Sequence, residues 1–226
     1  TENVESIVEI QHPLFRECLK EVPHKKNLEI SSLADIPGTG TGLGSSSSFT
    51  VGLLHALFRN SGKAVPKERL AELACEIEIE RCNETIGKQD QYAAAFGGIN
   101  RFDFLSNGEV KQRSIGLSPS FTETLNSHLL FLYTGRTRSA SSILEKQSSN
   151  IKQEKATNAL VDMVHLVSAF ERSLLDESLS DLGGLLNENW RLKKSLSENI
   201  SDSYLDEIYE VGISHGALGG KLLGAG

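Results

Sequence analysis

The chain has 226 residues, of which 38% are hydrophobic, so it can bury a core and form one large domain or two small ones. Its formal net charge of −7 and pI near 5.4 argue against nucleic acid as a partner, because binding nucleic acid requires a positive surface. Three cysteines without a CxxC pair favour the reducing cytoplasm. The sequence shows no signal peptide and no apolar run of about 20 residues, so it does not predict a membrane partner.

Strand-like runs are rich in β-branched, aromatic or leucine residues. They predict strands over residues 4–10, 28–33, 99–104 and 129–133. The first run has no preceding turn, and the glycine-rich turn of residues 219–226 leads to no further element. We therefore predict that the chain is truncated at both ends.

Apolar residues at three- and four-residue steps predict helices. The first follows Ser45–Ser48, the second begins with Pro66 at its first position, the third spans about 155–175, the fourth runs through 182–190 and as far as 196, and a short last helix begins near Ser201 or Ser203. A mixed half followed by a helical half predicts an α+β fold. We expect residues 1–150 to form one domain and residues 151–226 to begin a second domain.

A run of glycines and serines, residues 37–48, leads directly into the first predicted helix. Glycine lets the backbone approach a phosphate closely, and the free N–H groups of a helix N-terminus attract negative charge. The spacing matches neither Walker A nor GxGxxG. The candidate nucleotide-binding residues are Gly40, Gly42, Leu43, Gly44, Ser45, Ser46 and Ser47. The alternative is a Gly/Ser turn that only caps a helix.

Two motifs resemble those of the GHMP kinases, named for galactokinase, homoserine kinase, mevalonate kinase and phosphomevalonate kinase. Pro37 with Gly42-Leu43-Gly44-Ser45-Ser46 is similar to the central ATP-binding motif, and residues 221–226 are similar to the start of the third motif, which implies that Gly224 contacts substrate. The resemblance implies a ribosomal protein S5 domain 2-like N-terminal part and a ferredoxin-like C-terminal part. The family's first motif is not visible, which fits truncation.

Two carboxylates follow the serine run, Glu80 near the end of the second helix and Asp90 ten residues later. Phosphoryl transfer to an alcohol requires Mg²⁺ on the nucleotide and gains from a carboxylate that orients the attacking hydroxyl. The resemblance implies that Asp90 is the base and that Glu80 and Ser46 bind Mg²⁺, with Glu76 and Glu84 as rivals of Glu80. Without these roles Glu80 is a solvated helix residue and Asp90 a turn residue.

The substrate is suggested by residues 87–98 and 133–140, which resemble the sugar-kinase branch that phosphorylates the anomeric hydroxyl of heptose 7-phosphates. Arg136 and Arg138 are candidates for the distal phosphate of the sugar, because guanidinium offers several donors in fixed geometry, and Lys88 is a candidate substrate contact beside Asp90. Solvated side chains are the alternative for all three.

The sequence therefore predicts an ATP- and Mg²⁺-dependent kinase whose partners are ATP and a sugar or sugar phosphate. Three alternatives remain. The first is a kinase for another acceptor, such as fucose, arabinose or an isoprenoid alcohol. The second is a non-catalytic sensor that keeps the fold and binds sugar or ATP. The third is an α+β binding protein in which the serine run only caps a helix. The pattern does not predict an oligomeric state.

Overall fold

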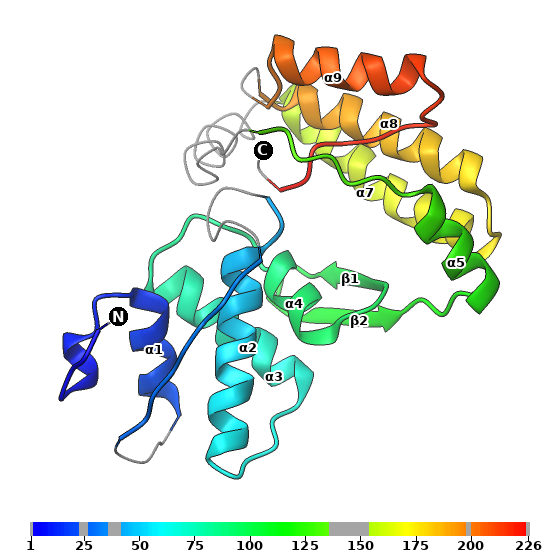
Figure 1. Cartoon of the computed structure of the whole chain (residues 1–226). Coiled ribbons are helices and arrows are strands. Elements are labelled where there is room, and N and C mark those ends of the chain that lie inside the picture. The colour runs from blue at the N-terminus through cyan, green and yellow to red at the C-terminus, as the bar shows by residue number, and fades with distance from the viewer. Residues whose placement is uncertain (1, 23–26, 36–41, 136–153, 198–199, 225–226) are drawn as a thin grey trace. The chain divides into compact units, whose positions relative to one another are not determined.

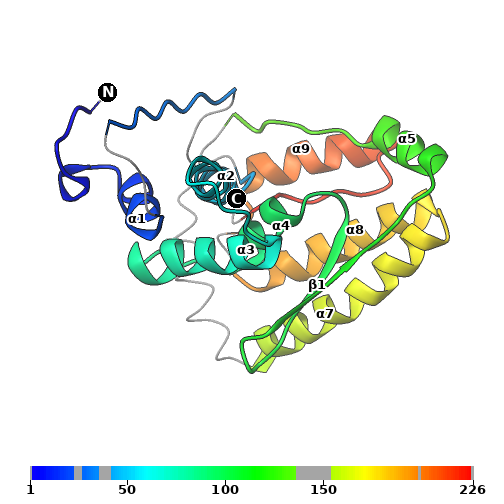
Figure 2. The same cartoon turned by 90° about the horizontal axis from the view of Figure 1, so that it is seen from below.

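The computed structural model describes residues 2–22, 27–35, 42–135, 154–197 and 200–224. The chain forms two compact units, Thr1–Asn100 and Arg101–Gly226 (Figures 1 and 2). The domain boundary expected at residue 150 lies outside the described residues and stays a prediction.

The first unit is helical. It contains the short 3-10 turn η1 (Ile7–Glu9) and the helices α1 (Pro13–Glu21), α2 (Ser45–Asn60), α3 (Lys67–Cys75) and α4 (Gln89–Phe96). The predicted α2 is confirmed, and its first turn is made by the serines themselves. Its apolar stripe, with Leu54 fully buried, packs with residues of α1 and α3 into one core. Burial of this stripe places the serine end of α2 beside the other helices.

Helix α3 continues without a break into a π-helical segment, η2 (Glu76–Arg81). The sequence predicted Pro66 as the first residue of this helix. In the structure Pro66 is the N-cap residue, and α3 begins at Lys67. In η2 the N–H of Cys82 bonds to the carbonyl of Ile77 at 2.9 Å, a five-residue step that widens the helix by one residue. Such widening changes which side chains face the neighbouring helices, and it occurs next to the site described below.

The second unit combines one hairpin with helices. It contains the strands β1 (Asn100–Phe104) and β2 (Val110–Ser114) and the helices α5 (Pro119–His128), α7 (Glu154–Leu175), α8 (Leu179–Ser195) and α9 (Ser203–Ser214). The hairpin is tied to α7 by buried Glu171, which pairs with Arg101 of β1 at 3.0 Å and with Arg113 of β2 at 2.5 Å. A separate apolar cluster around Trp190 and Ile200 joins α7 and α8.

The caps of these helices follow from short polar side chains. Ser118 caps α5 by accepting from the N–H of Phe121 at 3.0 Å, and Asp202 caps α9 by accepting from the N–H of Leu205 at 2.9 Å. The last helix begins at Ser203, as predicted, but its cap is Asp202 and not a serine hydroxyl. Asp202 occupies the position whose side chain reaches the free donors, while Ser203 is already helical.

Of the four predicted strands, residues 99–104 are confirmed as β1, which begins at Asn100. The strands predicted at 4–10, 28–33 and 129–133 are wrong for the part of the chain that the structure describes, where these runs form η1 or irregular backbone. Leu33 is 98% exposed and Leu130 is 87% exposed. A strand requires a neighbouring strand to accept its backbone hydrogen bonds, and residue composition does not reveal whether one is present.

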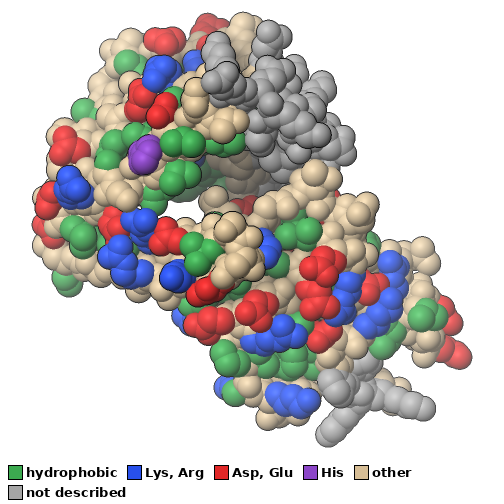
Figure 3. All heavy atoms as spheres, turned by 180° about the vertical axis from the view of Figure 1, so that it is seen from behind, with side chains coloured by type: hydrophobic (Ala, Val, Ile, Leu, Met, Phe, Trp, Pro, Cys, Tyr) green, Lys and Arg blue, Asp and Glu red, His purple; other side chains and the backbone are tan. Residues whose placement is uncertain are grey.

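The surface is mixed in charge. On the face shown in Figure 3, Lys and Arg side chains are interspersed with Asp and Glu and are not gathered into one patch. Surface pairs such as Arg81 with Glu21, 2.8 Å apart, join elements of the first unit. Within the described residues, no helix is long and apolar enough to cross a membrane.

Candidate active site

The start of α2 has the backbone that a phosphate-binding turn requires. Gly44, the N-cap residue, has φ of +65°, and Gly42 has φ of +70°, a region in which residues with a Cβ are strained. Ser45–Ser47 form the first turn, where N–H groups have no carbonyl within the helix to bond to. The described part of the loop therefore combines glycine turns with a helix N-terminus. Gly40 lies outside the described residues.

The serines of this turn differ in their surroundings. Ser46 is exposed, and Leu43 is 44% exposed, so both can reach a ligand from solvent. Ser47 is 2% exposed, and its Oγ donates to Oε2 of Glu78 at 2.8 Å. The turn therefore presents one serine outward and fixes the next to η2.

Glu78 is the buried carboxylate of the site. It is 1% exposed and accepts a second hydrogen bond on Oε2, from Nε2 of Gln91 at 2.6 Å. Among the described residues, no Lys or Arg forms an ion pair with it. Ser47, Glu78 and Gln91 come from α2, η2 and α4, so this carboxylate is the point at which three elements meet. A buried carboxylate whose described hydrogen-bond partners are all neutral donors can accept a cation.

Asp90 lies in the first turn of α4. Its side chain packs against Gly44. A Cβ added to that glycine would lie 3.3 Å from Cγ and Oδ2 of Asp90. Solvent still reaches Asp90, yet desolvation by the atoms around it raises the pKa of its carboxyl above the ordinary value. Asp90 thus lies directly beside the start of α2. Lys88, the residue before α4, is exposed.

Glu80, the predicted magnesium ligand, does not join this group. It is exposed on η2, whereas Glu78, two residues earlier, faces α2. Its rivals are no better placed, since Glu76 pairs with Arg81 and Glu84 is exposed. The geometry therefore supports Glu78 in place of Glu80.

Sequence reasoning missed Glu78 although a signal was present. Leu70, Ala74 and Glu78 recur at four-residue steps, and the first two belong to the apolar stripe of α3. A carboxylate that continues a buried stripe is rarely a surface residue. Gln91, fully buried on α4, was also missed.

A magnesium ion fits these residues. The described residues contain no group of three or more acidic, His or Cys side chains that could hold a metal without other ligands. Mg²⁺ is usually bound by one or two carboxylates together with substrate phosphates and water, so such a group is not needed. Glu78 makes both of its side-chain hydrogen bonds through Oε2, and its Oε1 has no hydrogen-bond partner among the described residues.

The other predicted substrate-binding residues lie in the second unit or outside the described residues. Gly224 belongs to the second unit, has φ of +63°, and its carbonyl accepts from Nζ of Lys193. Burial lowers the pKa of Lys221 in the same segment, and its Nζ donates to Oδ1 of Asn189 at 2.9 Å. Arg136 and Arg138 lie outside the described residues, so their predicted role stays a prediction.

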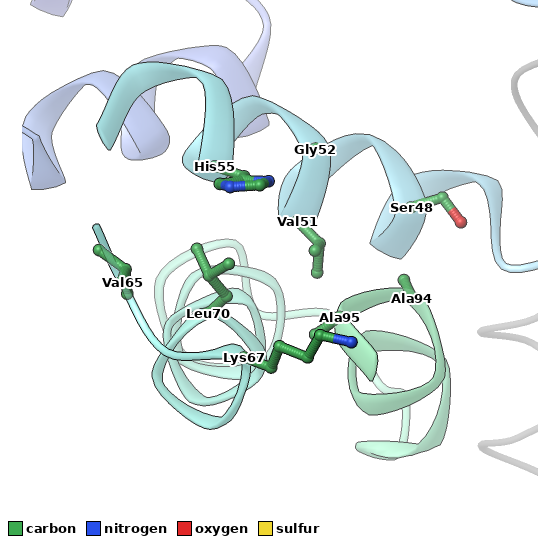
Figure 4. A pocket seen from close by; sticks show the side chains of 9 residues that line it. All are labelled: Ser48, Val51, Gly52, His55, Val65, Lys67, Leu70, Ala94 and Ala95. Atoms are coloured by element: carbon green, nitrogen blue, oxygen red, sulfur yellow. The ribbon is translucent and has the colours of Figure 1, made fainter. Parts of the chain in front are cut away.

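A shallow pocket of about 450 Å³ lies along α2, next to the serine turn (Figure 4). Its apolar walls come from α2, α4, the start of α3 and Val65. Lys67 lies between α3 and α4, and its Nζ donates to the carbonyl of Phe96 at 2.7 Å. Ser48 lies at the end opposite to His55 and Val65, so the pocket begins one residue beyond the Ser45–Ser47 turn (Figure 4).

Residues 7–98, which contain the serine turn, Glu78 and Asp90, match the family model of the GHMP kinases N terminal domain. This stretch is a GHMP kinase N-terminal domain. The whole chain is similar to D-glycero-alpha-D-manno-heptose 7-phosphate kinase of Campylobacter jejuni, with 30% identity over 220 residues, which are 97% of this chain and 65% of that protein. The family resemblance inferred from the motifs is confirmed.

Solved structures show the same GHMP kinase fold. The D-glycero-D-manno-heptose 1-phosphate kinase of Bacteroides thetaiotaomicron is 26% identical with a TM-score of 0.62, over 95% of this chain and 60% of that one. The mevalonate kinase of Methanococcus jannaschii is 23% identical with a TM-score of 0.63, over 94% of this chain and 63% of that one, a likeness of fold alone. The expected α+β GHMP kinase fold is confirmed, and the chain spans about 60 to 65% of the length of these relatives.

Proposed function

We propose that the protein containing this chain is a cytoplasmic, ATP-dependent sugar kinase that transfers the γ-phosphoryl group to a sugar hydroxyl, the anomeric hydroxyl of a heptose 7-phosphate. One observation carries the proposal. The N-terminus of α2, the buried carboxylate of Glu78 and the carboxylate of Asp90 meet at one place in a GHMP kinase N-terminal domain. Three free cysteines are consistent with a reducing compartment.

The glycine–serine turn binds the phosphates of ATP in this proposal. Gly42 and Gly44 allow close approach, and the N-terminal end of α2 offers N–H donors and positive partial charge. These donors are fixed before the nucleotide arrives, because Ser47 is buried and bonded to Glu78. Preorganised donors stabilise the charge on the transferring group without reorganising during the reaction.

Ser46 and Glu78 would hold Mg²⁺. The ion supplies positive charge that bridges and neutralises the nucleotide phosphates. The role predicted for Glu80 passes to Glu78, because only Glu78 is fixed beside the serine turn.

Asp90 orients the acceptor hydroxyl and accepts its proton as the hydroxyl oxygen bonds to the γ-phosphorus and the bond to ADP breaks. Its contact with Gly44, at the start of the proposed phosphate-binding turn, supports this role. Desolvation raises the pKa of the Asp90 carboxyl, which makes the carboxylate a stronger base than an ordinary aspartate. Both features favour an enzyme over a non-catalytic sensor.

The heptose phosphate assignment is supported by the names of the Campylobacter and Bacteroides relatives. Arg136 and Arg138 would bind the distal phosphate, with Lys88 and Gly224 as further substrate contacts. Another sugar acceptor, fucose- or arabinose-like, is the alternative.

A kinase panel tests the function. ATP consumption is measured with Mg²⁺ and with heptose 7-phosphate, heptose, fucose, arabinose and mevalonate as acceptors. We expect the heptose 7-phosphate to be the preferred acceptor, and replacement of both Arg136 and Arg138 by Ala to raise its KM without changing the KM of ATP. Equal use of heptose and its phosphate would reject the phosphate contact, and no consumption with any acceptor, despite Mg²⁺-dependent stabilisation by ATP, would favour a sensor.

A further inference from the structure

Gln91 is a buried amide that follows Asp90 on α4. Its side chain is completely buried, and Nε2 donates to Oε2 of Glu78 at 2.6 Å. Its Oε1 is also buried and has no hydrogen-bond partner among the described residues. An amide with an unused buried acceptor is less favourable in a core than an apolar side chain of similar size. Packing alone therefore does not explain a glutamine here.

The two donors to Glu78 act on the same atom. Ser47 Oγ and Gln91 Nε2 both donate to Oε2, at 2.8 Å and 2.6 Å. Together they fix the orientation of the carboxylate without neutralising its charge, because both donors are uncharged. Oε1 is left without a hydrogen bond from the described residues and can serve a cation.

We propose that Gln91 is a positioning residue, which holds Glu78 in the orientation that binds Mg²⁺ and links it to the acceptor carboxylate. This rests on the proposed function in so far as Glu78 binds the ion. Since Gln91 is adjacent to Asp90 in the first half of α4, a shift of α4 moves both the acceptor carboxylate and the orienting donor of the metal carboxylate. Hydrogen-bond partners of metal ligands often act in this way.

The decisive variant is Gln91→Met, which keeps the length and approximate volume of the side chain but removes the donor. We expect the Mg²⁺ concentration for half-maximal activity to rise about tenfold, as for lost partners of other metal ligands. The KM of the sugar should change less than about twofold, because Gln91 reaches Glu78 and not the acceptor. The matched control is Gln89→Met, an exposed glutamine in the same turn, which should leave the Mg²⁺ requirement unchanged.

Three outcomes are informative. A normal Mg²⁺ requirement in Gln91→Met, with a raised one in Glu78→Gln, would overturn the positioning role and leave the proposed function standing. A normal requirement in both variants would overturn the metal role of Glu78 and this proposal with it. A raised requirement in Gln91→Met, with an unfolding temperature in the absence of Mg²⁺ no lower than that of the wild type, supports it, since loss of a merely structural residue would lower stability instead.

If Gln91→Met does not fold, Gln91→Asn replaces it. Asparagine keeps the amide but withdraws it by about 1.5 Å, one carbon–carbon bond, so the 2.6 Å contact cannot form without movement. Mn²⁺ binding in the presence of ADP, measured by the paramagnetic signal of the free ion, gives a second readout that needs no turnover. We expect weaker Mn²⁺ binding in Gln91→Asn than in the wild type, and equal binding would overturn the proposal.

Discussion

Asp90 packs directly against Gly44. A Cβ on this glycine would lie 3.3 Å from Cβ, Cγ and Oδ2 of Asp90, and the backbone of Gly44 has φ of +65°. Two separate requirements thus exclude a side chain at this position, the left-handed backbone and the contact with the aspartate. The turn proposed to bind phosphate and the carboxylate proposed to bind the acceptor are therefore held at a fixed separation.

We expect Gly44→Ala to lower stability by about 1–2 kcal/mol, because alanine is strained in the left-handed region. It should also weaken MgATP binding, because the added methyl pushes Asp90 or the turn aside. Gly52→Ala is the matched control, since Gly52 lies within α2 and a Cβ there meets no atom within 4 Å. That variant should gain up to about 1 kcal/mol. Denaturant unfolding with and without MgATP measures both effects, and equal behaviour of the two variants would contradict the packing argument.

Asp90→Asn should reduce kcat by about 10²-fold or more while leaving the KM of ATP nearly unchanged, because asparagine cannot accept the hydroxyl proton. In the wild type kcat should rise with pH as Asp90 loses its proton. Since desolvation raises its pKa, the acid limb should lie above the ordinary aspartate value. Steady-state kinetics across pH checks both points, and near wild-type kcat in Asp90→Asn would exclude it as the base.

The same pKa shift predicts a stability effect of defined sign. A carboxyl whose pKa is raised on folding stabilises the protein below its unfolded pKa and loses that contribution as pH rises through the folded pKa. Asp90→Asn should therefore be more stable than the wild type at neutral pH, and the difference should shrink as the solution is acidified towards pH 3. Thermal unfolding at several pH values measures this, and a neutral-pH loss of stability in the variant would contradict it.

The parts of the fold that could be predicted depend on local chemistry. The start of α2 was predictable because glycines and serines before an apolar stripe act within one turn. Glu78 carried a signal in its four-residue step from Ala74, but its partners Ser47 and Gln91 lie on other elements, and sequence spacing does not reveal which elements pack together. The run 129–133 was mistaken for a strand because strand formation depends on a distant partner. Asp90 was identified by motif, but its helical setting was not.

A second close glycine contact holds the C-terminal segment against α8. A Cβ on Gly183 would lie 2.3 Å from Cβ of Leu218, whereas one on the next residue, Gly184, meets nothing within 4 Å. We expect Gly183→Ala to cost about 1–3 kcal/mol through overpacking and Gly184→Ala to stabilise α8 by up to about 1 kcal/mol. Thermal unfolding of the two variants checks the contrast, and similar shifts in both would show that the segment does not pack against Gly183.

The choice between Glu78 and Glu80 as the proposed Mg²⁺ ligand gives the sharpest test of the site. The two glutamates stand two residues apart on η2, but Glu78 is buried against Ser47 and Gln91 while Glu80 is exposed. We expect Glu78→Gln to raise the Mg²⁺ requirement at least about tenfold and to lower kcat, because a neutral amide is a poorer ligand for a hard cation.

Glu78→Gln should also lower stability by about 1–3 kcal/mol. The amide NH₂ of glutamine needs an acceptor, whereas Ser47 and Gln91 both present donors to this side chain. Glu80→Gln should change the Mg²⁺ requirement less than about twofold and stability by no more than about 0.5 kcal/mol, as expected for an exposed side chain. Titration of activity with Mg²⁺ at fixed ATP, together with unfolding curves, separates the two. A larger effect of Glu80→Gln on the Mg²⁺ requirement would assign the metal role to Glu80. The contacts of Glu78 with Ser47 and Gln91 would then have no role in metal binding.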